Sequence, residues 1–161
     1  MWFDRWNFDS ATFVASTTTF NTIFRIPKQH TMMEKELKSA VESEDEQKLI
    51  KCLDLTRFGK FDRNCYEYIE KALVGTWHNH HEDLVNTIYL KNLIDDRFVD
   101  PILNIALNKE RFRWYDDELE ATLRKCVHAL KTINSAVSNS ALQKLKDLNN
   151  DNVRFALDMY E

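Results

Sequence analysis

Glycine and proline are nearly missing from this chain, which has two of each among 161 residues. A chain of average composition carries about 7% glycine and about 5% proline. Folds built from strands and tight turns use glycine for positive φ angles and proline for rigid turns. The scarcity of both residues disfavours such folds. It predicts an all-α chain that is nearly continuous helix and short turn after about residue 30.

Cysteine is also scarce, and the three cysteines are widely separated, at Cys52, Cys65 and Cys126. This number and spacing exclude a dense disulfide framework. Each cysteine lies beside apolar residues within an expected helix. We therefore expect three reduced thiols in the core of a cytoplasmic or nuclear protein.

The chain also lacks long hydrophobic runs and an excess of positive charge. No stretch approaches the roughly 20 apolar residues that span a bilayer, so we expect no membrane association. The first residues lack a basic segment followed by an apolar one, which argues against a secretory signal. The formal net charge of −4 and the pI near 5.8 argue against nucleic acid as a partner.

Residues 1–30 differ in composition from the rest. They interleave seven large aromatic residues with serine and threonine, and the aromatic ones are Trp2, Phe3, Trp6, Phe8, Phe13, Phe20 and Phe24. We interpret them as an N-terminal arm preceding a single α-helical domain over residues 31–161. The arm has three open interpretations: it packs on the helical body, it faces a partner, or it is a tail without fixed structure. An arm that packs on its own body can also pack on another copy, so a homo-oligomer formed through residues 1–30 is a further alternative.

Signals for helix ends divide the remaining chain into about eight short helices. We expect capping boxes at Thr31 with Glu34 and at Ser43 with Glu46. We expect aspartate caps at Asp62 and at Asp100, which precedes Pro101. Acidic residues 116–118 are expected to start the longest helix. Breaks are expected at Gly59, at Gly75 and at residues 134–135. The apolar stripe of the longest helix is predicted to consist of Leu119, Leu123, Cys126, Val127, Leu130 and Ile133.

Two C-terminal segments carry a resemblance to a known class of helical repeats. Residues 118–133 resemble a long repeat helix with its turn, and residues 141–157 join an apolar helix, an acidic turn, Val153-Arg154 and a second helix. Together they resemble armadillo or HEAT-type repeats over about a quarter of the chain. The resemblance implies stacked helix pairs in which Asp151 caps the last helix, Val153 packs between helices and Arg154 reaches back to the acidic turn.

The same resemblance implies a scaffold or adaptor with an elongated groove for a peptide or partner helix. The alternative architecture is an irregular helical bundle. A weaker similarity covers residues 51–112. Its short helices, with Leu90-Lys91-Asn92-Leu93-Ile94, resemble the small helical bundles of transcription-elongation-factor N-terminal domains.

The sequence carries no glycine-rich phosphate loop and no nucleophile motif, so we expect neither enzymatic activity nor a cofactor. One cluster has metal-ligand character: His78, His80 and His81, followed by Glu82 and Asp83. The adjacent His80 and His81 would point in different directions on a helix, and no paired Cys-x-x-Cys or HExxH motif accompanies them. We interpret the cluster as a solvated turn and helix start. A metal-dependent helical enzyme built on it remains an alternative.

Residues 109–115 interleave three cations with three aromatic residues. Aromatic residues and arginine dominate binding hot spots. We therefore predict that Trp77, Arg113, Trp114 and Tyr115 bind a partner. We expect a protein–protein interaction module, an adaptor or scaffold that binds another protein or peptide segment. The alternatives are a connecting loop anchored in the core, a nucleic-acid-binding helical domain that uses residues 109–115, and a self-associating helical regulator.

Overall fold

The computed structural model describes residues 28–54 and 61–160, and in this part of the chain the elements are all helices, joined by turns, without strands. The all-α prediction is confirmed, with nine α-helices in the described residues where about eight were expected. Their bounds are α1 (Lys28–Glu42), α2 (Glu46–Leu53), α3 (Tyr66–Val74), α4 (His81–Leu90), α5 (Val99–Leu107), α6 (Lys109–Phe112), α7 (Ala121–Ile133), α8 (Ala136–Lys146) and α9 (Asp151–Asp158). Two short 3₁₀ turns, Arg63–Cys65 and Asp96–Phe98, precede α3 and α5. Residues 1–27 of the predicted arm and the expected break at Gly59 lie outside the described residues.

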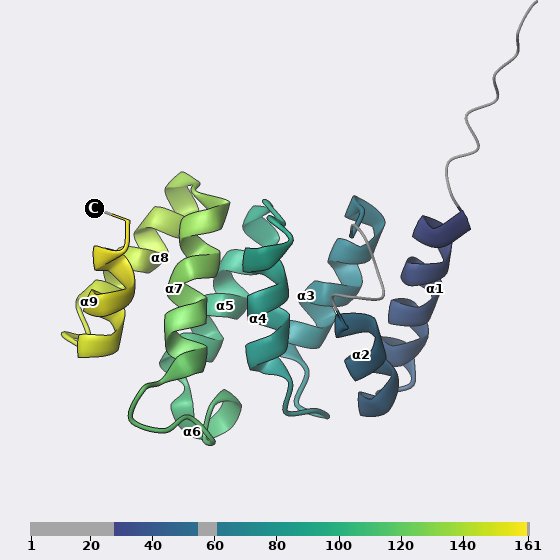
Figure 1. Ribbon diagram of the computed structural model, residues 1–161, viewed down its shortest axis with the longest axis horizontal. Coiled ribbons are helices and arrows are strands. Elements are labelled where there is room, and N and C mark those ends of the chain that lie inside the picture. Colours follow the sequence, from purple (N-terminus) through teal and green to yellow (C-terminus); the bar gives the residue numbers. More distant parts are fainter. Residues whose placement is uncertain (1–27, 55–60, 161) are drawn as a thin grey trace, which may run out of the picture.

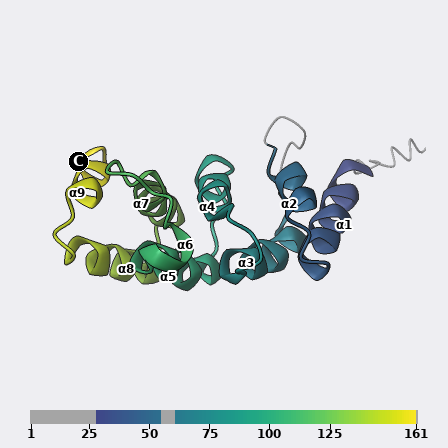
Figure 2. The same cartoon turned by 90° about the horizontal axis from the view of Figure 1, so that it is seen from below.

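The helices form an elongated stack of two layers (Figures 1 and 2). Helices α3, α5 and α8 lie in one layer and α2, α4, α7 and α9 in the other, with α1 at one end against α2 and α3. Helix α1 packs on α2 at its end of the stack, and across the layers α3 packs on α4, α5 on α7, and α8 on α9. The stack therefore consists of helix pairs placed side by side. The short α6 lies at one edge of the stack, below α5 and α7 in Figure 1.

Helix α7 occupies the most enclosed position, because it packs against α4, α5, α8 and α9. Its predicted stripe is buried from Leu123 to Ile133, but Leu119 is 59% exposed. The expected helix start at residues 116–118 was wrong, since α7 begins only at Ala121. The carboxylate of Asp116 instead accepts hydrogen bonds from the backbone N–H and the hydroxyl of Thr122. At 13 residues α7 is also shorter than α1, which has 15.

The three cysteines are thiols rather than disulfides and are buried in the core, as predicted. Cys126 lies in the buried stripe of α7, and burial raises the pKa of its thiol to about 12. Cys65 opens the buried stripe of α3, and burial, reinforced by the charge of Asp62, raises the pKa of this thiol to about 12 as well. Both thiols therefore remain protonated and inert at neutral pH.

The predicted helix caps are correct in part. Asp62 accepts a hydrogen bond from the backbone N–H of Asn64, at the 3₁₀ turn that opens α3. The expected cap at Ser43 was wrong, since its hydroxyl donates to the carbonyl of Ser39 and Asp45 caps α2 by accepting from Lys48 N–H. A cap must lie directly before the first helical residue, and α2 begins at Glu46.

Two other expected helix starts moved by a few residues, and the last helix begins at Asp151 as expected but with a different cap. Thr31 lies inside α1, which begins at Lys28, and α5 begins at Val99, one residue before Asp100. Asn150 caps α9 in place of Asp151, which is the first residue of the helix. The expected packing of Val153 is confirmed by its burial, and Arg154 forms an exposed ion pair with Asp151. None of the helices in the described ranges combines the length and apolar character needed to cross a membrane.

Candidate interaction surface

The four predicted partner-binding residues lie in two connections at the lower edge of Figure 1, between α3 and α4 and between α6 and α7. A chain of ring contacts joins the two connections. Trp77 packs edge-on to His78, with ring centroids 4.5 Å apart, and His78 lies 4.6 Å from His81. His81 in turn packs 4.8 Å from the ring of Phe112 in α6. The edge is therefore a packed assembly of rings rather than a set of free loops.

Two of the three histidines are structural, which corrects the interpretation of the cluster as a solvated turn. His78 and His81 are buried, and their Nε2 atoms lie 3.0 Å from the carbonyl oxygen of Ala72 and 2.9 Å from that of Gly75. Burial, with the nearby His81, lowers the pKa of His78 to about 4, and burial lowers the pKa of His81. Both rings are thus neutral at pH 7 and donate through Nε2 to carbonyl oxygens that can only accept.

His80, the third histidine, is partly exposed and lies within ion-pair distance of Asp83 and Glu46, at 3.0 and 3.4 Å. The three imidazoles therefore do not converge on one point. In residues 28–54 and 61–160, no group of three or more histidine, cysteine, aspartate or glutamate side chains is arranged to hold a metal ion.

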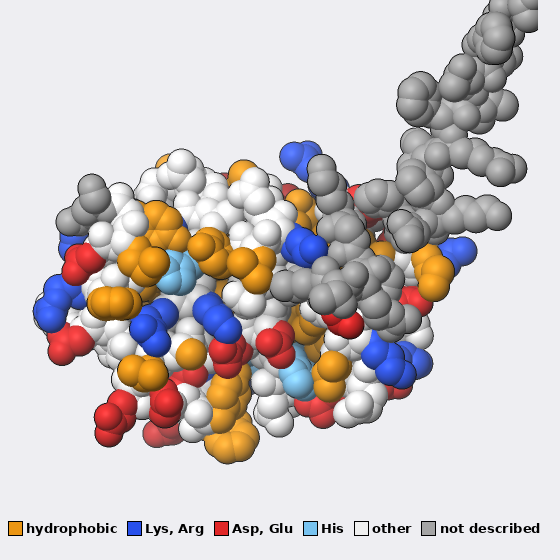
Figure 3. Space-filling model, in the orientation of Figure 1, with side chains coloured by type: hydrophobic (Ala, Val, Ile, Leu, Met, Phe, Trp, Pro, Cys, Tyr) orange, Lys and Arg blue, Asp and Glu red, His pale blue; other side chains and the backbone are white. Residues whose placement is uncertain are grey.

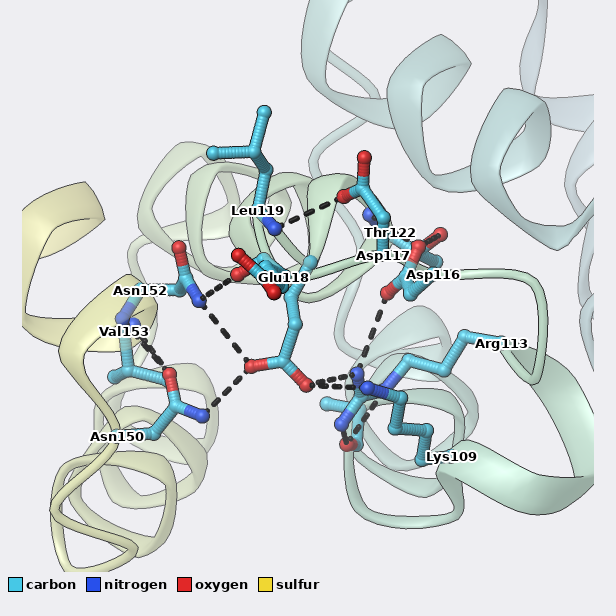
Figure 4. A network of polar contacts seen from close by, with 12 residues as sticks. Lys109, Arg113, Asp116, Asp117, Glu118, Leu119, Thr122, Asn150, Asn152 and Val153 are labelled. Atoms are coloured by element: carbon cyan, nitrogen blue, oxygen red, sulfur yellow. Dashed lines mark hydrogen bonds and ion pairs between the residues drawn. The ribbon is translucent and has the colours of Figure 1, made fainter.

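Arg113 is the centre of an internal polar network, shown in Figure 4. Its Nε and Nη2 donate to the carbonyl of Ala106 at 3.0 and 2.8 Å. Its Nη1 lies 3.0 Å from Glu120 and 3.3 Å from Asp116. The residue is only 5% exposed. The guanidinium is therefore satisfied within the stack, and its position supports a structural role rather than direct contact with a partner.

Glu120 extends this network to the last helix. Its carboxylate accepts hydrogen bonds from Asn150 Nδ2 at 2.7 Å and from Lys109 Nζ at 3.3 Å, besides the one from Arg113 (Figure 4). Burial by itself raises the pKa of Glu120, but the hydrogen bonds from Asn150, Arg113 and Lys109 outweigh burial and lower the pKa to about 2. Glu120 therefore connects α6, α7 and the start of α9 as a permanent anion.

The other three predicted residues differ in exposure. Trp114 is 62% exposed and meets Tyr115 edge to face, with 5.7 Å between ring centroids. Tyr115 is half-buried, and burial raises the pKa of its phenol. Trp77 packs partly buried against the core over Gly75, where a Cβ atom would lie 2.6 Å from the indole Nε1. Only Trp114 thus offers a partner most of its ring.

A second surface, outside the set of residues predicted from the sequence, lies on α4, α7, α9 and the turn that follows α9. We call it the aromatic–cationic face, and it consists of Tyr89, Arg124, His128, Lys131, Phe155 and Tyr160. Arg124, His128 and Lys131 follow one another at helical spacing on α7, on the side opposite its buried stripe. Figure 3 shows hydrophobic side chains gathered over α7 and its neighbours in this layer, with basic side chains among them.

The rings of this face are held by specific contacts. The imidazole of His128 stacks 5.3 Å from Tyr89 and lies 5.6 Å from the ring of Tyr160. His128 Nδ1 is 2.8 Å from the Tyr160 hydroxyl, at hydrogen-bond distance. Burial, with the charge of Arg124, lowers the pKa of His128, so this bond involves a neutral imidazole at pH 7. The three rings therefore form one connected group across α4, α7 and the turn that follows α9.

Two cations lie over the remaining aromatic surface. Lys131 Nζ is 5.5 Å from the centroid of Tyr160, and the guanidinium carbon of Arg124 is 5.7 Å from the centroid of Phe155. Phe155 is 58% exposed, Tyr160 44% and Tyr89 37%. Beside Arg124 and Phe155, a hollow of about 480 Å³ opens between α9 and Leu119. The face thus offers exposed rings, fixed cations and an adjacent depression.

One sequence signal indicated part of this face. The positions of α7 outside its buried stripe include the partly exposed Arg124, Lys125, His128 and Lys131, and the helix contains no acidic residue. Tyr89 and Tyr160 lie far from α7 in sequence, so only the packing of α4 and α9 against α7 brings their rings to His128.

Comparison of the chain with protein-family models, with curated proteins and with solved structures finds no match.

Proposed function

We propose that this protein is an interaction module that binds a segment of another protein on its aromatic–cationic face. The observation that carries the proposal is the connected group of Tyr89, His128 and Tyr160, which spans α4, α7 and the turn after α9 and leaves both tyrosines exposed. Exposed aromatic residues gathered on one face are typical of protein interaction sites.

Contacts within the chain hold these rings in place before a partner binds, and this favours binding. Stacking and the contact between His128 and Tyr160 hold two tyrosines, while Lys131 and Arg124 lie over Tyr160 and Phe155. A side chain that is already fixed loses less conformational entropy on binding. The opposite side of α7 is buried, so His128, whose ring contacts both tyrosines, stands on one of the best-packed helices of the stack.

The first set of candidate residues is narrowed accordingly. Trp114 remains a candidate partner contact at the lower edge, because its ring is largely exposed. Arg113 belongs to the internal network, and Trp77 packs against the core. We therefore place the main contact on the aromatic–cationic face and treat Trp114 as a separate anchor.

A peptide-display selection tests the proposal. Random-sequence peptides are selected on the full chain, and their affinities are then measured for the variant Phe155→Ala/Tyr160→Ala. We expect at least a tenfold loss, since truncating a central aromatic hot spot costs about 2 kcal/mol or more. Val137→Ala is the matched control, because Val137 is a similarly exposed apolar residue, 47% exposed, on α8 in the other layer.

Circular dichroism and urea unfolding show whether each variant remains folded. Peptides that bind the double variant and the wild type equally would place the binding site elsewhere. Because rings beside cations also suit nucleic-acid bases, single-stranded RNA and DNA are titrated over a range of salt concentrations. Tight, salt-dependent binding that requires Arg124 and Tyr160 would overturn the proposal in favour of a nucleic-acid function.

A further inference from the structure

We infer that the segment bound on the aromatic–cationic face is acidic, with carboxylates beside apolar anchor residues. This inference rests on the proposed function and adds the chemistry of the partner. It follows from the positive charges of α7 and from the finding that, among the described residues, no acidic side chain pairs with Arg124 or Lys131.

The charge of α7 is opposite to that of the whole chain. The helix holds three cationic residues and no acidic one, whereas the chain has a net charge of −4. Lys125 forms an ion pair with Glu82 of α4. For Arg124 and Lys131, the contacts found within residues 28–54 and 61–160 are those with the rings of Phe155 and Tyr160, and no acidic side chain pairs with either cation.

Three acidic side chains near this layer are occupied elsewhere, and a fourth, Asp158, lines the hollow beside Arg124 without forming an ion pair among the described residues. Glu82 pairs with Lys125, Asp83 lies against His80, and Asp151 pairs with Arg154. No rearrangement of these existing pairs is needed for Arg124 and Lys131 to receive carboxylates from outside. Both positive charges thus remain available.

A ring beneath a cation orients the cation without neutralising it. The negative face of the ring attracts the charge, and the partly buried stem loses some of its freedom. A carboxylate that approaches from the open side then gains a charge-assisted hydrogen bond, which is stronger than a neutral one. The guanidinium of Arg124 can also bind a carboxylate through two parallel N–H groups.

The spacing of the two cations limits the pattern of the partner. Arg124 and Lys131 are seven residues apart, which is about 10 Å along a helix axis. Two turns of a partner helix, or about three residues of an extended chain, separate carboxylates by the same distance. The exposed rings of Tyr160 and Phe155 adjoin the two cations. An acidic segment with apolar residues between its carboxylates therefore complements the face.

The experiment is a pair of parallel peptide-display selections. One uses the wild-type chain and the other the charge-reversed variant Arg124→Glu/Lys131→Glu. We expect peptides selected on the wild type to carry net negative charge, and those selected on the variant to be neutral or basic. The wild-type peptides should lose at least about tenfold in affinity for the variant, and similarly when their own carboxylates are replaced by amides.

The matched control is Lys144→Glu/Lys146→Glu, which reverses two exposed lysines of α8 in the other layer. It changes the net charge equally, so it should leave both the composition of the selected peptides and their affinity unchanged. If both charge-reversed variants weaken binding alike, attraction by the overall charge accounts for the result, and the inference is wrong.

The remaining outcomes separate the inference from the proposed function. Neutral or basic peptides that still depend on Phe155 and Tyr160 would overturn the acidic partner and leave the interaction module standing. A wild-type selection that yields no peptide dependent on this face would overturn both. Binding of single-stranded nucleic acid that is lost in the Arg124→Glu/Lys131→Glu variant would also overturn both, because it would explain the same cations by phosphate recognition.

Discussion

Arg113 shows how the surroundings of one residue decide its role. In the sequence it stands between Phe112 and Trp114 and has the composition of a binding hot spot. In the structure its donors are taken by Ala106, Asp116 and Glu120. A buried guanidinium needs such partners, because leaving a buried charge unpaired is costly. The neighbouring Trp114, which has no such demand, remains 62% exposed.

Glu120 makes stability depend on pH. Its pKa is about 2 in the folded chain, against an ordinary value of 4.5. Above pH 4.5 the carboxylate is ionised in both states and its stabilising effect is complete. As the pH falls from 4.5 towards 2, the unfolded chain takes up the proton first, so stability decreases by at most about 3 kcal/mol from this group.

Urea unfolding measured between pH 6 and pH 2 checks this expectation with the variant Glu120→Gln. The variant should be less stable at pH 6 and should lose less stability on acidification than the wild type. Glu110→Gln changes an exposed glutamate of α6 and serves as the control. Parallel pH profiles for wild type and Glu120→Gln would show that the network does not hold Glu120 ionised.

At the scale of elements, α9 depends on one residue for two functions. The side-chain oxygen of Asn150 accepts from the N–H groups of Asn152 and Val153, at 2.8 and 3.2 Å, and so caps the helix. Its Nδ2 donates to Glu120 and ties the helix to the preceding pair. Because α9 has only eight residues, its stability depends on such contacts rather than on helix propensity.

Asn150→Ala should therefore destabilise the chain by about 1–2 kcal/mol and increase hydrogen exchange in α9. Asn150→Asp separates the two functions, because aspartate can cap the helix but cannot donate to Glu120. We expect the amides of Asn152 and Val153 to stay protected in the aspartate variant and to lose protection in the alanine variant. Asn139→Ala, at an exposed position of α8, is the control. Equal loss of protection in both Asn150 variants would contradict the capping role.

For the molecule as a whole, the helices of the stack differ in how many neighbouring helices they pack against. Helix α7 contacts helices on both sides and in both layers, whereas α2 lies near one end. A cavity in α7 should thus weaken more of the structure than one in α2. Leu130 and Leu49 are fully buried leucines at these two positions.

Leu130→Ala and Leu49→Ala should each cost about 3 kcal/mol or more, because both leave a cavity. Hydrogen exchange separates them. Leu130→Ala should expose amides in α4, α5, α8 and α9, and Leu49→Ala mainly amides in α1 and α2. If both variants raise exchange equally throughout the described helices, the stack unfolds as one unit and the expectation is wrong.

The sequence by itself determined the fold class, the cap at Asp62, the helix end at Gly75 and the burial of the three cysteines. These follow from local physics: scarce glycine and proline exclude strand-and-turn folds, while helical spacing and side-chain caps act over a few residues. The scaffold and adaptor interpretation, the armadillo or HEAT resemblance and the role of residues 1–30 stay predictions.

Only the tertiary structure decided that His78, His81 and Arg113 are internal, that Leu119 is exposed, and that Tyr89, His128 and Tyr160 meet. Whether a polar side chain is buried depends on which distant helix covers it, and residues 39 and 32 positions apart carry no local mark of contact. The aromatic–cationic face arises from the packing of α4 and α9 on α7, because packing alone brings three separate helices to one surface.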